Sequence, residues 1–170
     1  MEFQDLIKKR YSCRKFSDAP VSADLIEKVI EAASLAPTAM NTQTFKIWLI
    51  SSQSAKENIN SITNYSFGAN NFMVLGSKSG NSWVRPDDNM DCTDIDAAIA
   101  GTHIMLAMYE YGLATTWVAS FNAPELKKLY PQMSEYKLLG LFPFGYPAPD
   151  SKPSSAHEKR KTVSELTEVL

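Results

Sequence analysis

The stretch that decides the fold is Asp96–Met108, DAAIAGTHIMLAM, inside a helix that we predict from about Asp94 to Tyr111. Gly112 is well placed to end this helix, because glycine readily takes the left-handed conformation that follows many helices. The stretch is apolar on nearly every face, and a helix of that kind is buried on all sides. A chain of 170 residues offers little cover for it. The stretch therefore predicts a homodimer in which a second subunit covers part of the helix.

Helices and strands alternate on both sides of this stretch. Ser22 is expected to cap a helix that runs to Ala36 and that Pro37 ends, since the residue before a proline avoids helical angles. The other predicted helices span 2–9, 54–62, 124–130 and 163–170, and the predicted strands span 45–51, 71–77, 115–121 and 136–144. A long loop over 79–93 is a candidate functional segment. With no repeat and no linker, we expect one α/β or α+β domain over residues 1–170.

Composition and charge exclude several classes of protein. Apolar residues make up 44%, charged residues make up 21% and the net charge is −2, which excludes a disordered chain and favours neither nucleic-acid nor membrane binding. No apolar run approaches the roughly 18 residues of a membrane helix, and the N-terminus lacks a signal-peptide pattern, so we expect a cytoplasmic protein. The two cysteines and two histidines suit neither a disulfide framework nor a metal site: Cys13, Cys92, His103 and His157.

Two basic segments are candidates for binding an anion. Arg10, Ser12 and Arg14 alternate, and in an extended segment alternate residues point to one face. Two guanidiniums and a hydroxyl on one face suit a phosphate or a carboxylate. The alternative is a solvated basic patch. The segment 157–161, HEKRK, adds basic residues near the C-terminus, although a solvated tail explains it equally.

Two further segments are candidates for binding a flat ligand. Thr38, Asn41 and Gln43 follow Pro37, and their amides can both donate and accept along the edge of a heteroaromatic ring. A capping turn after the helix is the alternative. Small residues at 119–120, Ala-Ser, leave the backbone open to a flat ligand, although a strand that ends in a turn explains them equally well.

Together these segments resemble the nitroreductase family of FMN-dependent oxidoreductases, in order and spacing over nearly the whole chain. The family motif Arg-x-Ser-x-Arg-x-Phe is found at 10–16, and the Ala-Pro-Ser-like turn leading to Asn-x-Gln at 36–43. The remaining matches are Asp96-Ala97-Ala98, Gly112-Leu113-Ala114 with Trp117, Gly145-Tyr146-Pro147 and the closing Arg160. The departures are Thr38 for serine, Thr44 for proline, Ala114 for glycine, His103 for asparagine and Glu158 for lysine, for which Lys159 is the expected substitute.

The resemblance implies an α+β, nitroreductase-like fold, with a central, mostly antiparallel sheet flanked by helices, in an intertwined homodimer that binds FMN at its interface. It implies that one subunit contributes residues to the phosphate, the ribityl chain and the ring edge, namely Arg10, Ser12, Arg14 and Arg160. Ala119 and Ser120 are implied to face the ring. The other subunit is implied to contribute Pro37, Thr38, Met40, Asn41 and Gln43.

The implied reaction passes hydride from NADH or NADPH through flavin N5 to an electron-poor acceptor, such as a nitroaromatic or a quinone, by ping-pong turnover. The first step needs no acid–base pair, so no catalytic side chain is assigned. Three alternatives stay open. They are a flavoenzyme of the same fold with another reaction, such as reductive dehalogenation or flavin fragmentation, a nonenzymatic flavin-binding protein, and a phosphate-binding module without flavin. The acceptor and the choice between NADH and NADPH are not readable from the sequence.

Overall fold

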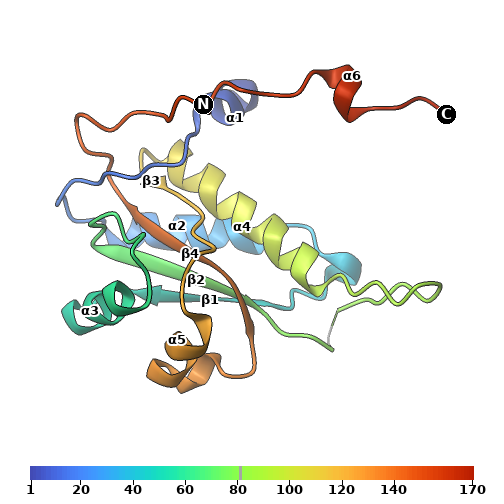
Figure 1. The fold of residues 1–170 in the computed structure, drawn as a ribbon, viewed down its shortest axis with the longest axis horizontal. Helices are drawn as coiled ribbons and strands as arrows, with labels where there is room; N and C mark the ends of the chain where they lie inside the picture. Colours follow the sequence, from blue (N-terminus) through green and yellow to red (C-terminus); the bar gives the residue numbers. More distant parts are fainter. Residues whose placement is uncertain (81) are drawn as a thin grey trace.

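A four-stranded antiparallel sheet lies between two layers of helices in the computed structural model, which describes residues 1–80 and 82–170 (Figure 1). The strand order is β1-β2-β4-β3, with β1 at Phe45–Ile50, β2 at Asn71–Ser77, β3 at Ala114–Thr115 and β4 at Lys137–Gly145. The α-helices are α1 (Phe3–Lys9), α2 (Ala23–Ser34), α3 (Gln53–Ile62), α4 (Thr93–Glu110), α5 (Ala123–Leu129) and α6 (Val163–Leu166). The expected α+β class with an antiparallel sheet is confirmed.

The sheet separates two apolar cores because alternate residues of a strand point to opposite faces. In β2, Phe72 and Val74 belong to the core that includes residues of α3 and α5. Met73 and Leu75 point the other way and belong to the core that includes residues of α2 and α4. Residues 72–77 are buried on both faces, so β2 is a central strand with helices above and below.

Helix α4 is covered along only one side. It runs from Thr93 to Glu110, and Gly112 follows it with a φ of +75°, as its C-terminal position requires. The opposite side has residues that are exposed or half-buried at helical spacings of three and four: Ile95, Ala98, Ile99, Thr102, Met105, Leu106 and Tyr109. Most of these side chains are apolar, so within one chain the helix keeps an apolar face that α2 and the sheet do not cover.

The expected strand over 115–121 is wrong beyond its first residue, since β3 contains only Ala114 and Thr115. The chain leaves the ladder because the Trp117 indole folds back across β4, where its Nε1–H donates to the carbonyl of Leu139 at 3.1 Å. A Cβ on Gly140 would lie 2.7 Å from that nitrogen, so glycine makes room for the ring. Val118 then rejoins Leu141 in an isolated bridge. Residues 119 and 120, which follow this bridge, lie outside the sheet and are exposed.

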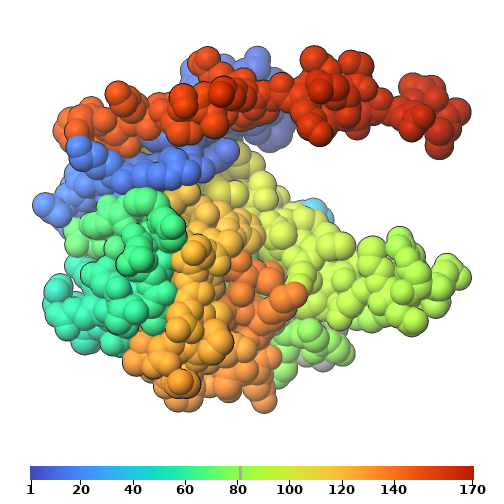
Figure 2. Space-filling view, in the orientation of Figure 1, coloured from blue at the N-terminus to red at the C-terminus, as the bar shows by residue number. Residues whose placement is uncertain are grey.

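The C-terminal arm, residues 151–170, extends along α1 and past the body of the molecule (Figures 1 and 2). The helix expected over 163–170 is shorter than predicted, because α6 ends at Leu166 and Thr167 is extended. Apolar side chains of the arm are almost fully exposed, with Val163 at 78% and Val169 at 98%. The arm thus presents apolar surface that its own chain does not cover.

Along the described chain, no helix combines the length and the apolar character that crossing a membrane requires.

Candidate functional site

The N-terminal basic segment borders a cavity of about 180 Å³, here called the arginine cavity. Ser12 pairs with Thr115 of β3, and the Cys13 N–H donates to the Thr115 carbonyl at 3.0 Å, which holds the segment extended against the sheet edge. The C-terminal arm closes the cavity from the other side. The lining residues are Arg10, Tyr11, Ser12, Arg14, Ser154, Ala156, His157 and Arg160. The structure thus brings together all four residues that the resemblance implies for the phosphate half of the site.

The arginine cavity carries positive charge, and no carboxylate is among its described lining residues. None of the ion pairs in the described parts of the chain involves Arg10, Arg14 or Arg160. Arg14 donates instead to the Ser12 carbonyl, and Arg160 donates to the Lys159 carbonyl. Partial burial and the nearby charge of Arg160 lower the pKa of Arg10. Like charges that share a half-buried space favour an anion between them.

At this cavity, His157 comes from the predicted basic segment 157–161, whereas Ser154 and Ala156 were not predicted. His157 and Ser154 line it, whereas Lys159 and Glu158 do not. Lys159, the expected substitute for the family lysine, contributes its backbone carbonyl to Arg160. His157 lies edge-on to Tyr11, with ring centroids 6.4 Å apart, and its Nε2 lies 3.1 Å from the Lys8 carbonyl. Ser154 and Ala156 precede this basic segment, and no motif identifies them.

A second space adjoins the arginine cavity through Arg14, which borders both. It measures about 220 Å³, and its wall consists of residues 116–120 with Tyr65 and Phe67. Ala119 and Ser120 are exposed there, as the expected flat-ligand contacts require. Thr63 fixes the wall, because its hydroxyl donates to the Ser120 carbonyl at 2.7 Å. The pair Tyr65 and Phe67, with ring centroids 6.0 Å apart, was not foreseen, since two aromatic residues in a short polar loop carry no distinctive signal.

The 37–43 turn is strained and outward-facing. Met40, Asn41 and Gln43 have positive φ values of 54°, 56° and 50°, a conformation that is unfavourable for residues other than glycine. The turn persists because hydrogen bonds fix it: Thr38 Oγ1 accepts from the Gln43 N–H at 3.1 Å, and Asp96 Oδ1 accepts from the Ala39 N–H at 2.8 Å. Met40 is 80% exposed, and Asn41 and Gln43 are also exposed.

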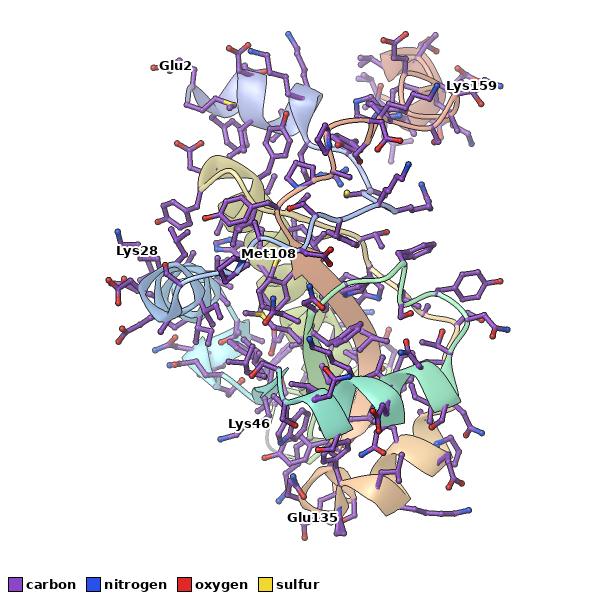
Figure 3. The ribbon with its side chains drawn as sticks, turned by 90° about the vertical axis from the view of Figure 1, so that its left-hand side faces the viewer. Glu2, Lys28, Lys46, Met108, Glu135 and Lys159 are labelled. Carbon is purple, nitrogen blue, oxygen red and sulfur yellow. The ribbon has the colours of Figure 1, made fainter. Side chains whose placement is uncertain are left out.

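One chain does not bring the 37–43 turn to the arginine cavity. The turn is bonded to Asp96 in the first turn of α4, whereas Ser12 pairs with Thr115 beyond the last turn. At 1.5 Å per residue, the 18 residues of α4 span about 27 Å. In Figure 3, Lys159 of the C-terminal arm lies at the top of the molecule, and Lys46 of β1 lies well below it.

The donor set of the arginine cavity fits a phosphate, because guanidiniums and a hydroxyl bind phosphate oxygens well. The second space is lined by the small exposed residues Ala119 and Ser120 and by aromatic residues, which fits a planar ring. A molecule that joins a phosphate to a planar ring, as FMN does, matches both spaces.

Known proteins resemble the chain along most of its length. The family model described as "Nitroreductase family" matches residues 7–70 and 62–146. A nitroreductase family protein of Clostridium difficile 630 is 30% identical with a TM-score of 0.89, over 99% of this chain and 98% of that one. Iodotyrosine deiodinase 1 of Rattus norvegicus is 25% identical over 97% of this chain and 68% of its own length. A protein of Exiguobacterium sibiricum 255-15, whose crystal structure is a complex with FMN, matches with a TM-score of 0.83. The match covers 100% of this chain and 98% of that one, and at 15% sequence identity it shows the fold alone.

Proposed function

The chain belongs to the nitroreductase family, and from this premise we propose that it is an FMN-dependent oxidoreductase that passes hydride from NADH or NADPH to an electron-poor acceptor. A nitroaromatic or a quinone is the expected class of acceptor. The observation that carries the proposal is the arginine cavity. Its guanidiniums form no ion pair in the described chain, and Arg14 also lines a second space that suits a planar ring.

The chain's own residues have distinct tasks in this proposal. Arg10, Arg160 and Ser12 bind the phosphate, and Arg14, which borders both spaces, orients the ring edge. Ala119 and Ser120 offer exposed backbone to one side of the ring. Bound FMN supplies the redox chemistry, and the protein supplies binding, orientation and electrostatics. No side chain is assigned a proton-transfer role.

We propose that two subunits complete each site. The uncovered apolar face of α4 and the exposed arm are surfaces that a second copy would bury. When two α4 helices pack antiparallel about a two-fold axis, the N-terminal end of one lies beside the C-terminal end of the other. The 37–43 turn of one subunit then approaches the arginine cavity of its partner. This arrangement accounts for a strained turn whose Met40, Asn41 and Gln43 face outward.

Reductive dehalogenation is the second candidate, because Iodotyrosine deiodinase 1 of Rattus norvegicus matches almost the whole chain. Both reactions use the same cofactor site, so the arginine cavity does not separate them. The relative turnover rates with iodotyrosine, a nitroaromatic and a quinone distinguish the two reactions.

The test begins with flavin-free protein that is titrated with FMN and then assayed for NADH and NADPH oxidation with each acceptor. We expect binding of about one FMN per subunit and turnover with at least one acceptor. Arg14→Met should impair both binding and turnover, whereas Lys128→Met, at an exposed lysine paired with Glu125, should change neither. Failure to bind FMN contradicts the proposal. FMN binding without oxidation of either nucleotide indicates a nonenzymatic flavin-binding protein.

A further inference from the structure

Asp96 is a buried carboxylate that joins two segments far apart in the sequence. Its side chain lies in the first turn of α4, and the residue is 2% exposed. One oxygen, Oδ1, accepts from the Ala39 N–H at 2.8 Å, and the other, Oδ2, accepts from Ser82 Oγ at 2.8 Å. Ala39 belongs to the 37–43 turn. Ser82 begins a hairpin, residues 82–92, in which Val84 pairs with Asp91.

Two hydrogen-bond donors and the N-terminal end of α4 stabilise the Asp96 carboxylate. Asp96 forms none of the ion pairs among the described residues. Carboxylates are favourable in the first turn of a helix, where backbone N–H groups leave a partial positive charge. Hydrogen bonds to an ionised acceptor are stronger than those between neutral groups. Asp96 therefore attaches both segments to α4, and at 2% exposure its carboxylate has little access to solvent.

The hydrogen bond from Ala39 to Asp96 stabilises the strained conformation of the 37–43 turn. The three residues with positive φ, Met40, Asn41 and Gln43, lie within four residues after Ala39. Such a conformation persists only where surrounding bonds determine it. The Asp96 bond is the one that connects the turn to α4, whereas the bonds of Thr38 and Thr42 stay within the turn.

We propose that Asp96 is a positioning residue, which fixes the 37–43 turn and the 82–92 hairpin relative to α4 and thereby sets the affinity for FMN without touching it. This inference rests on the proposed function only for its effect on FMN. The local effect, that one carboxylate holds both segments, is independent of any ligand.

The first experiment measures hydrogen exchange by mass spectrometry on flavin-free protein. Asp96→Ala should raise exchange in the turn and in the hairpin, and Ser82→Ala should raise it in the hairpin alone. The matched control is Asp94→Ala, because Asp94 lies two residues earlier on α4 and is bonded to Ser77 and Lys137 but to neither segment. The same pattern in Asp94→Ala, or unchanged exchange in Asp96→Ala, overturns the inference.

The second experiment measures the Kd for FMN. If the turn is populated in its competent conformation only about one-tenth of the time in Asp96→Ala, the Kd rises about tenfold. Asp96→Asn keeps an oxygen for the Ala39 N–H and an amide for Ser82 Oγ, so we expect its Kd within about threefold of the parent value. Asp94→Ala should bind like the parent.

The outcomes separate this inference from the proposed function. A parent protein that does not bind FMN refutes the proposed function, and the exchange experiment then still decides the local role of Asp96. A parent that binds FMN beside an Asp96→Ala protein of equal affinity refutes the positioning role. An Asp96→Asn protein as impaired as Asp96→Ala also contradicts it.

Discussion

Replacement of Arg10 by methionine separates the charge of this residue from its packing. The half-buried arginine lines the arginine cavity, and its pKa is lowered by burial and by the charge of Arg160. Methionine keeps the apolar stem and removes the charge. A lost charge-assisted hydrogen bond corresponds to roughly 1.5–3 kcal/mol, so FMN binding should weaken about 10- to 150-fold. Riboflavin lacks the phosphate and should bind the variant as it binds the parent.

The stability of the flavin-free protein gives a second, independent result. Because burial and Arg160 both disfavour the charged form of Arg10, Arg10→Met should leave the melting temperature unchanged or raise it. Flavin fluorescence titration with FMN and riboflavin measures the two affinities, and thermal unfolding measures the stability. Lys128→Met serves as the control for the loss of one positive charge. Equal losses for FMN and riboflavin, or no loss for FMN, would refute the assignment of Arg10 to the phosphate.

Three further predictions concern assembly and packing. Leu106→Glu puts a charge on the uncovered face of α4. The mass measured by light scattering should fall from about twice the 18.9 kDa chain mass to that of one chain, and FMN binding should be lost. A monomer that binds FMN normally would contradict the shared site. Thr44→Val removes a buried hydroxyl that has no partner among the described residues, and thermal unfolding should show a gain of about 1 kcal/mol, or roughly 2–4 °C; a lower melting temperature would show that the hydroxyl is satisfied. In Gly101→Ala the new Cβ would lie 2.5 Å from Trp117 Cζ3, so urea unfolding should show a loss of about 1–3 kcal/mol, and an unchanged midpoint would contradict the close packing.

Local sequence signals predicted the elements whose boundaries depend on local chemistry. The predicted cap Ser22 is confirmed, since its hydroxyl accepts from the Leu25 N–H at the start of α2, as serine does at many helix starts. Gly112 ends α4 with a positive φ. The strand over 71–77 was predicted to the residue, because a continuous apolar run bounded by polar residues suits a central strand.

The errors arise where distant residues decide the local structure. The chain at 116–121 has strand composition, but the Trp117 indole needs the space above Gly140 and pulls the backbone out of the ladder. Tyr65, Phe67 and Ser154 border the candidate site only because the fold brings together four segments, 10–14, 65–67, 116–120 and 154–160. The resemblance predicted the motif residues and their division between two subunits, whereas the placement of the two groups at opposite ends of α4 required the structure.

That division has a genetic consequence. If two subunits complete each site as proposed, a mixed dimer of one Arg10→Met chain and one Asp96→Ala chain has one site with both unaltered halves and one site with both altered halves. Such a preparation should hold about half the FMN of the parent dimer, more than either variant alone at the same FMN concentration. Two alleles that each impair the protein would then complement one another in the same cell. Arg10→Met and Arg14→Met alter the same half, so every mixed dimer of these two chains would carry a defect in both sites.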